Sequence, residues 1–139
     1  MLNYLLILLI FLSPQIKKKE TKKEKIISLE RTACYGNCPI YRIEIYEDNS
    51  GIYHGKRFVK KIGYYDFRLT KSEVLNILQK ADNIEFNKMK NEYVEAISDL
   101  PTTFICIKEK KIKDYFGAPK ELKELEKLID KTTQENLDF

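Results

Sequence analysis

The sequence predicts an α+β fold, a two-layer sandwich in which two helices cover one face of an antiparallel sheet of four or five strands. Alternating apolar and polar residues fill much of the first half of the chain, and two segments with helical periodicity lie far apart in the sequence. The connections between the alternating segments are short and rich in turn-forming residues. The expected order is strands, helix, hairpin, helix, and a length of 139 residues fits one domain.

The first strands flank a segment rich in turn formers. Residues 27–31 and 41–45 alternate apolar and polar side chains, and the sequence CYGNCP between them holds Gly and Pro. Residues 48–51, with the sequence DNSG, have the composition of a hairpin turn. We therefore expect a third strand from Ile52, with bends at Gly55 and Gly63.

The clearest helix start in the sequence is a capping box. Thr70 and Glu73 form the T-x-x-E pattern, and Leu69 is placed to pack on Val74 across it. Apolar residues at helical spacing follow, so we expect a helix that runs to about Asp82.

The second half of the domain begins with an irregular stretch. Residues 83–101 lack periodicity, and loops of this length inside compact domains are uncommon and often functional. We predict a second hairpin over residues 102–116 and a last helix that begins near Pro119. We place the domain at residues 26–131 and expect residues 132–139 to form a frayed tail.

The N-terminal residues 1–16 carry an apolar run from Tyr4 to Leu12. This is the length of the core of a secretory signal, about 7–15 residues, whereas a spanning helix needs about 20. We expect an export signal or signal-anchor that leaves the protein exported, periplasmic or membrane-tethered. The run has no preceding Lys or Arg and no A-x-A site, so an inner-face anchor or a misassigned start codon stays as the alternative. No Cys lies just after the run, since the first one is Cys34, and this argues against a lipoprotein.

The positive charge of the chain is confined to one segment. Residues 17–25 hold six Lys and two Glu, while residues 26–139 hold 19 basic and 19 acidic side chains. We interpret residues 17–25 as a Lys-rich, solvated linker and expect membrane contact only through residues 1–25. A neutral domain does not favour nucleic acid as a partner.

Cys34 and Cys38 are the sharpest chemical feature of the sequence. In an exported protein, this C-x-x-x-C pair is expected to form a structural disulfide, although reduced thiols and redox or metal chemistry stay open. A zinc site would also need the isolated His54 and Cys106, which lack the usual paired spacing. We assign no catalytic, cofactor-binding or metal-binding residues and expect no cofactor.

The segment from Ile27 to Tyr41 resembles the opening of the bacterial family called domain of unknown function 6438. The family pattern R-x-x-C-[YF]-G-x-C-P-x-Y is matched at residues 31–41, D-x-x-G at 48–51 and Y-x-G-x-x-x-V at 53–59. Later similarities are S-D-L-P at residues 98–101, Tyr115 with Gly117, and the closing helix to Asp130. The resemblance covers roughly residues 26–131. It implies small envelope or secreted proteins, often behind a lipoprotein signal, with no assigned activity.

These features favour a non-enzymatic envelope module, for binding or structure, over an enzyme. We expect it to present the CYGNCPIY turn and the loop at residues 83–101 to a protein, peptide or glycan of the envelope. The alternative is a thiol-redox or metal-dependent protein that uses Cys34 and Cys38. The candidate surface consists of Arg31, Tyr35, Gly36, Pro39, Tyr41 and Asp99.

Overall fold

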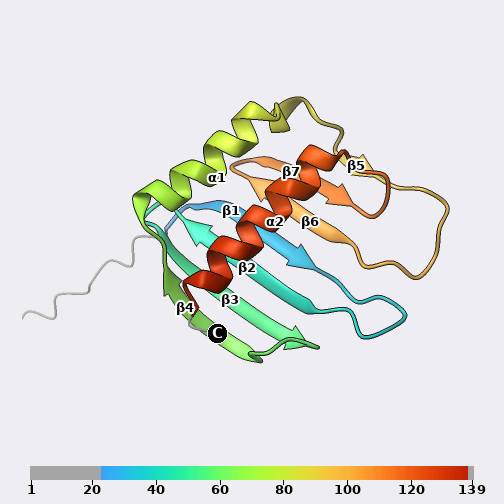
Figure 1. Cartoon of the computed structure of the whole chain (residues 1–139), viewed down its shortest axis with the longest axis horizontal. Coiled ribbons are helices and arrows are strands. Elements are labelled where there is room, and N and C mark those ends of the chain that lie inside the picture. The colour runs from blue at the N-terminus through green and yellow to red at the C-terminus, as the bar shows by residue number, and fades with distance from the viewer. Residues whose placement is uncertain (1–22, 138–139) are drawn as a thin grey trace, which may run out of the picture.

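A computed structural model describes residues 23–137. These residues form one sheet with the strand order β4-β3-β2-β1-β6-β7-β5 and two α-helices that lie across it (Figure 1). The predicted α+β class is confirmed. Residues 1–16 and most of the 17–25 linker lie outside the described residues. The elements are β1 (Lys25–Arg31), β2 (Ile40–Tyr46), β3 (Ser50–Arg57), β4 (Gly63–Arg68), α1 (Lys71–Asn83), the 3-10 turn η1 (Phe86–Lys88), β5 (Glu92–Tyr93), β6 (Thr103–Ile107), β7 (Lys110–Asp114) and α2 (Lys120–Glu135).

The prediction of four or five antiparallel strands was wrong. The sheet has seven strands and is mixed, because β5 runs parallel to β7. Two segments account for the difference. The aromatic stretch after Gly63 pairs with β3 along its length as β4, and the two-residue β5 lies inside the stretch interpreted as an irregular loop. A strand of two residues is too short to show alternation.

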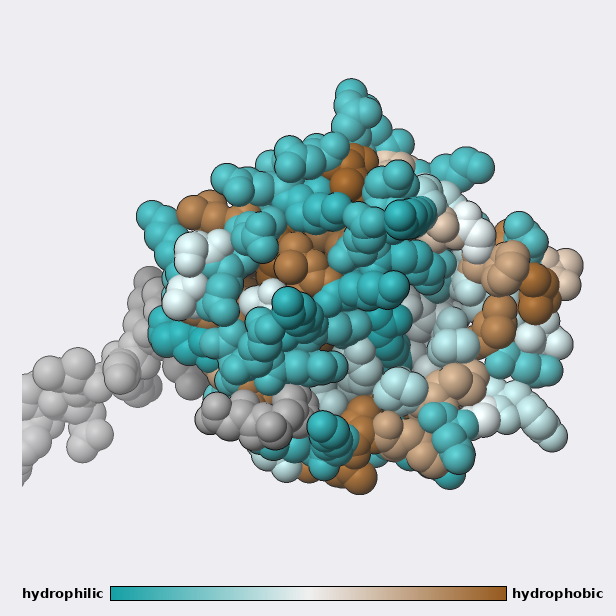
Figure 2. Space-filling view, viewed as in Figure 1, coloured by the Kyte–Doolittle hydropathy of each residue, from teal (hydrophilic) through white to brown (hydrophobic). Residues whose placement is uncertain are grey.

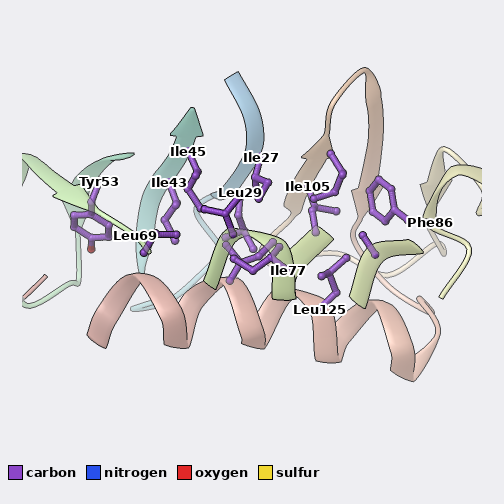
Figure 3. Close-up of a cluster of buried hydrophobic side chains, with 14 of the residues drawn as sticks. Ile27, Leu29, Ile43, Ile45, Tyr53, Leu69, Ile77, Phe86, Ile105 and Leu125 are labelled. Atoms are coloured by element: carbon purple, nitrogen blue, oxygen red, sulfur yellow. The ribbon is translucent and has the colours of Figure 1, made fainter. Parts of the chain in front are cut away.

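The core lies between the sheet and the two helices. Figure 3 shows Ile43 and Ile45 of β2 and Ile105 of β6 directed toward Ile77 of α1 and Leu125 of α2, and all five side chains are at most 1% exposed. Burying an aliphatic side chain of this size contributes about 1.5–3 kcal/mol. The apolar residues of the alternating strands and the apolar residues at helical spacing thus pack together in one core.

The start of α1 is the predicted capping box. The Glu73 amide donates to Thr70 Oγ1 at 3.2 Å, and the Thr70 amide donates to Glu73 Oε2 at 2.7 Å. Leu69 and Val74, which flank the box, are both buried in the core. The helix ends at Asn83, one residue beyond the predicted end.

Helix α2 extends into the segment that we expected to fray. It continues to Glu135, and Thr132, Thr133 and Leu137 are buried. The Asn136 side chain donates to Glu73 Oε1 at 2.9 Å, which ties the end of α2 to the start of α1. Packing therefore holds residues whose polar composition suggested a tail. Neither described helix is long and apolar enough to span a bilayer.

The other face of the sheet carries charged and aromatic side chains. Arg42 pairs with Glu30 at 2.8 Å between neighbouring strands. The rings of His54 and Tyr64 stack with centroids 3.8 Å apart. This face lies opposite the helices, away from the core.

Candidate functional site

The structure divides the predicted surface residues into two groups. Tyr35, Gly36, Pro39 and Asp99 are exposed, whereas Arg31 and Tyr41 point toward the helices. The strand pattern explains this placement, because Arg31 lies two residues beyond the buried Leu29 and therefore faces the same side of the sheet.

Arg31 lies in a row of polar residues that crosses four strands. The row consists of Tyr41, Arg31, Thr103 and Asp114, each directly opposite the next on the neighbouring strand. Lys123, Glu126 and Asp130 of α2 contact this row. We call these seven residues the polar row.

Arg31 is the hub of the polar row. Its Nη2 donates to Asp130 Oδ2 at 2.6 Å, its Nε donates to the Tyr41 hydroxyl at 2.8 Å, and its Nη1 donates to Thr103 Oγ1 at 2.9 Å. The Tyr41 hydroxyl in turn donates to Asp130 Oδ1 at 2.6 Å. Both oxygens of Asp130 are thus occupied, and α2 is fixed to the ends of β1 and β2.

The pKa shifts of Arg31 and Tyr41 are those expected of groups that form a structural hydrogen-bond network. Burial by itself lowers the pKa of Arg31, but the nearby Asp130 carboxylate and its hydrogen bond leave that pKa raised. Burial raises the pKa of Tyr41, and the charge of Asp130 raises it further. Arg31 therefore keeps its charge and Tyr41 its proton, so Tyr41 acts as a hydrogen-bond donor and is a poor nucleophile.

The other end of the polar row holds two buried carboxyl groups. Asp114 and Glu126 are each 1% exposed, Lys123 forms an ion pair with Asp114, and Arg31 Nη1 lies 3.5 Å from Glu126 Oε2. Burial, followed by a hydrogen bond with Asp114, raises the pKa of Glu126 to about 7. Asp114 Oδ1 and Glu126 Oε1 have no donor within residues 23–137. Protonation of Glu126, which its raised pKa favours, would supply one.

A pocket of about 240 Å³ opens beside the polar row, between α2, β2, β3 and the connection from β3 to β4. Tyr41 and Asp130 belong to both the row and the pocket. Apolar walls come from other elements, and the rings of Tyr41 and Tyr53 lie 5.7 Å apart, centroid to centroid. The walls are formed by Pro39, Ile43, Tyr53, Phe58 and Val59.

The outer wall of the pocket depends on a sharp fold in the β3–β4 connection. A Cβ atom at Gly55 would overlap the Lys61 carbonyl oxygen and crowd Tyr53 and Val59. Phe58 adopts a φ of 54°, an uncommon conformation for a bulky residue. Backbone strain of this kind concentrates at ligand sites.

Replacing Gly55 with alanine is expected to destabilise the domain by about 1–3 kcal/mol, the usual cost of forcing an extra group into a packed region. Urea denaturation measures the change. Gly36→Ala is the matched control, since a Cβ there meets only Cys34 Sγ at an ordinary 3.8 Å. Equal stability of the two variants would contradict the proposed overlap.

Cys34 and Cys38 form a disulfide that closes the turn between β1 and β2, with Cα atoms 5.8 Å apart. The loop that contains Asp99 lies beside this turn. The Tyr35 amide donates to the Asp99 carbonyl at 3.4 Å, and the Thr32 amide donates to the Thr102 carbonyl at 3.0 Å. The disulfide thus shapes a turn that a second, distant loop supports.

Replacing both cysteines of the pair with serine is expected to cost at most about 2 kcal/mol, because a loop this short loses little entropy in the unfolded chain. Thermal and urea unfolding of the double variant measure the loss. A loss above about 4 kcal/mol would mean that the bridge holds more of the fold than its turn.

The other two residues considered for a metal site lie elsewhere. His54 and Cys106 occupy the open face of the sheet, where Cys106 Sγ donates to the Lys108 carbonyl at 3.2 Å. No group of three or more His, Cys, Asp and Glu side chains suited to a metal ion occurs between residues 23 and 137.

Sequence reasoning missed the α2 members of the polar row. Lys123, Glu126 and Asp130 follow one another at helical spacing, within the stripe that also carries Leu125 and Ile129. Charged residues inside an apolar stripe are a signal of buried polar contacts. That signal was present, but it does not reveal which strand residues the three side chains meet.

Comparison with known proteins places the chain in a family without assigning an activity. A search of curated proteins finds no match. A family model described as "Domain of unknown function (DUF6438)" matches residues 25–133. Residues that carry the resemblance in the sequence, among them Pro39, Tyr41, Tyr53 and Val59, line the pocket together. The chain therefore belongs to the DUF6438 family.

Proposed function

We propose that this protein is a non-enzymatic binding module of the cell envelope that captures a partner at one end of its sheet. We call this end the motif end and define it by three connections, at residues 32–39, 58–62 and 94–102. The observation that carries the proposal is the exposure of large apolar side chains there. Tyr35 is 89% exposed, Val94 50% and Ile97 40%.

The surface at the motif end has the character of a binding site. Figure 2 shows apolar side chains gathered over the connection between β5 and β6. Exposed apolar patches on a soluble protein mark interaction sites, and loops held by a rigid scaffold commonly bind partners. Here the disulfide and the Asp99 contact hold the loops, which limits the entropy lost on binding.

The position of the start of β1 supports this arrangement. Lys25, at the start of β1, lies opposite Tyr46, at the end of the sheet away from the motif end (Figure 1). A tether formed by residues 1–25, as the leader and the Lys-rich linker suggest, would attach there. The motif end would then point away from the membrane and toward a partner in the envelope.

Removing the exposed apolar side chains of the motif end is expected to abolish capture. In a pull-down from solubilised envelope of the producing cell, with the full chain as bait, the variant Tyr35→Ala/Ile97→Ser should retain less than about a tenth of the partner. Partners are identified by mass spectrometry, and the melting temperature should stay within about 2 °C because surface changes cost little.

The control is Leu75→Ser, which changes a side chain of α1 that is 44% exposed and lies outside the motif end. It should capture the partner like the unaltered protein. Unchanged capture by the Tyr35→Ala/Ile97→Ser variant would contradict the proposal.

A further inference from the structure

The connection between β5 and β6 is held in place at the motif end by contacts from two other segments. The Tyr115 hydroxyl, which follows β7, donates to the Ile97 carbonyl and accepts from the Leu100 amide at 3.4 Å. From the turn between β1 and β2, the Tyr35 amide donates to the Asp99 carbonyl at 3.4 Å. The connection therefore presents its side chains from a backbone that is already positioned, which lowers the cost of ordering on binding.

Apolar and acidic side chains are interleaved in this connection. Val94 and Ile97 are 50% and 40% exposed, Glu95 lies between them in the sequence, and Asp99 follows two residues after Ile97. Both acidic residues are exposed. A partner that covers Val94 and Ile97 therefore also removes water from Glu95. Because a carboxylate taken out of water without a cation costs free energy, the source of that cation decides which partner fits.

The protein itself does not supply the cation. In the part of the chain that the structure describes, neither Glu95 nor Asp99 forms an ion pair, and Asp99 Oδ2 accepts only from the neighbouring Ser98 hydroxyl, at 3.1 Å. The turn at residues 32–39 and the connection at residues 115–119 hold no charged residue. Lys side chains near the ends of β7 and α2 pair with other carboxylates, Lys113 with Glu92 and Lys120 with Glu124. The local field therefore favours a cationic partner.

We propose that the partner segment captured at the motif end carries Lys or Arg side chains on either side of an apolar anchor. The anchor covers Val94 and Ile97, and the cations pair with Glu95 and Asp99. The inference rests on the proposed function and names the chemistry of the partner. Complementary charges of this kind add specificity and speed the encounter.

The charge separates this partner from other classes. An acidic segment is repelled, and a neutral apolar segment leaves the carboxylates covered without a counter-charge. A surface of anionic lipid is likewise repelled by two exposed carboxylates. Only a segment that is both apolar and basic satisfies the whole surface.

The test measures fluorescence anisotropy of labelled synthetic peptides titrated with the full chain. Three peptides share the core Leu-Phe and differ in the two residues on each side, which are Arg, Gln or Glu. The Arg peptide should bind about fivefold more tightly than the Gln peptide, because it adds two partly covered ion pairs, and the Glu peptide should bind most weakly. A fourth peptide, with Arg flanks and Ser-Ser as its core, should bind about tenfold more weakly than the first. Equal affinity for the Arg and Gln peptides overturns the inference.

A double variant locates the charge effect. Glu95→Gln/Asp99→Asn removes both charges with little change of shape, and Asn tolerates the φ of 72° at residue 99. It should bind the Arg and Gln peptides within about twofold of each other. Glu109→Gln/Glu135→Gln is the matched control, since it removes two charges from exposed sites outside the motif end and should keep the Arg preference. An equal loss of preference in the two variants would mean that the total charge, and not this connection, selects the peptide.

The two proposals fail in different ways. If Tyr35→Ala/Ile97→Ser loses the envelope partner but Glu95→Gln/Asp99→Asn captures it fully, the proposed function stands and the inference about its partner is wrong. If the Arg preference depends on Glu95 and Asp99 as expected but Tyr35→Ala/Ile97→Ser still captures the envelope partner fully, the proposed function is wrong.

Discussion

Replacing Arg31 with methionine is expected to lower the free energy of unfolding by about 3 kcal/mol. The change removes the cation that serves Asp130 at 2.6 Å and contacts Glu126 at 3.5 Å, and it removes donors from Tyr41 and Thr103. Removing one partner of a buried ion pair costs about 3–5 kcal/mol, because the remaining charge stays buried without compensation. The Arg31 side chain is 23% exposed, which places the expected loss at the lower end. Urea denaturation at neutral pH measures it.

Arg42→Met is the matched control for this prediction. Arg42 pairs with Glu30 at 2.8 Å on the neighbouring strand, but on the open face, where its side chain is 44% exposed. Exposed pairs contribute about 0–1 kcal/mol, so the control should lose little. Asp130→Asn in the Arg31→Met background should recover part of the loss, since it removes the uncompensated carboxylate. Equal losses for Arg31→Met and Arg42→Met would show that the polar row is not a buried network.

The elements that sequence reasoning predicted well are those whose signals are local. The capping box at Thr70 lies within four residues, and its two hydrogen bonds form as the pattern requires. The alternation around Ile43 likewise predicted both the strand and its buried face. The elements that failed have short or mixed signals. β5 spans two residues, and the end of α2 is polar in composition although Thr133 is fully buried.

In the candidate site, too, features with local signals were predicted and contacts between distant residues were not. Arg31 and Tyr41 were singled out because they belong to the motif that resembles the family, but we placed them on a surface with Tyr35. Their role depends on Asp130, which is 99 residues from Arg31 in the sequence. No local pattern encodes a contact over that separation. Arg31 lies two residues after Leu29 in the strand, so the alternation did indicate that its side chain faces the core. A buried Arg requires an acidic partner. The sequence therefore indicates that a partner exists without naming it.

Replacing Glu126 with glutamine is expected to stabilise the protein above neutral pH, by as much as about 3 kcal/mol at pH 8. The pKa of Glu126 is raised from 4.5 to about 7 in the folded protein, first by burial and then by the hydrogen bond with Asp114. The folded state therefore binds the Glu126 proton more tightly than the unfolded state. The stabilising contribution is complete below pH 4.5 and is lost as the pH rises through about 7. Glutamine keeps a donor toward Asp114 at every pH, so this loss should disappear.

Urea denaturation at pH 4.5, 6 and 8 separates this effect from a general change in packing. The unaltered protein and Glu126→Gln should have similar stability at pH 4.5 and diverge as the pH rises. Glu124→Gln is the control on the same helix. The Glu124 side chain is 43% exposed, and its pKa is lowered by a hydrogen bond from Lys80, so removing its charge should give no gain at any pH. If the stability of Glu126→Gln changes with pH in parallel with that of the unaltered protein, Glu126 does not carry the proton that joins it to Asp114. The buried carboxyl pair would then need another source for the missing donor.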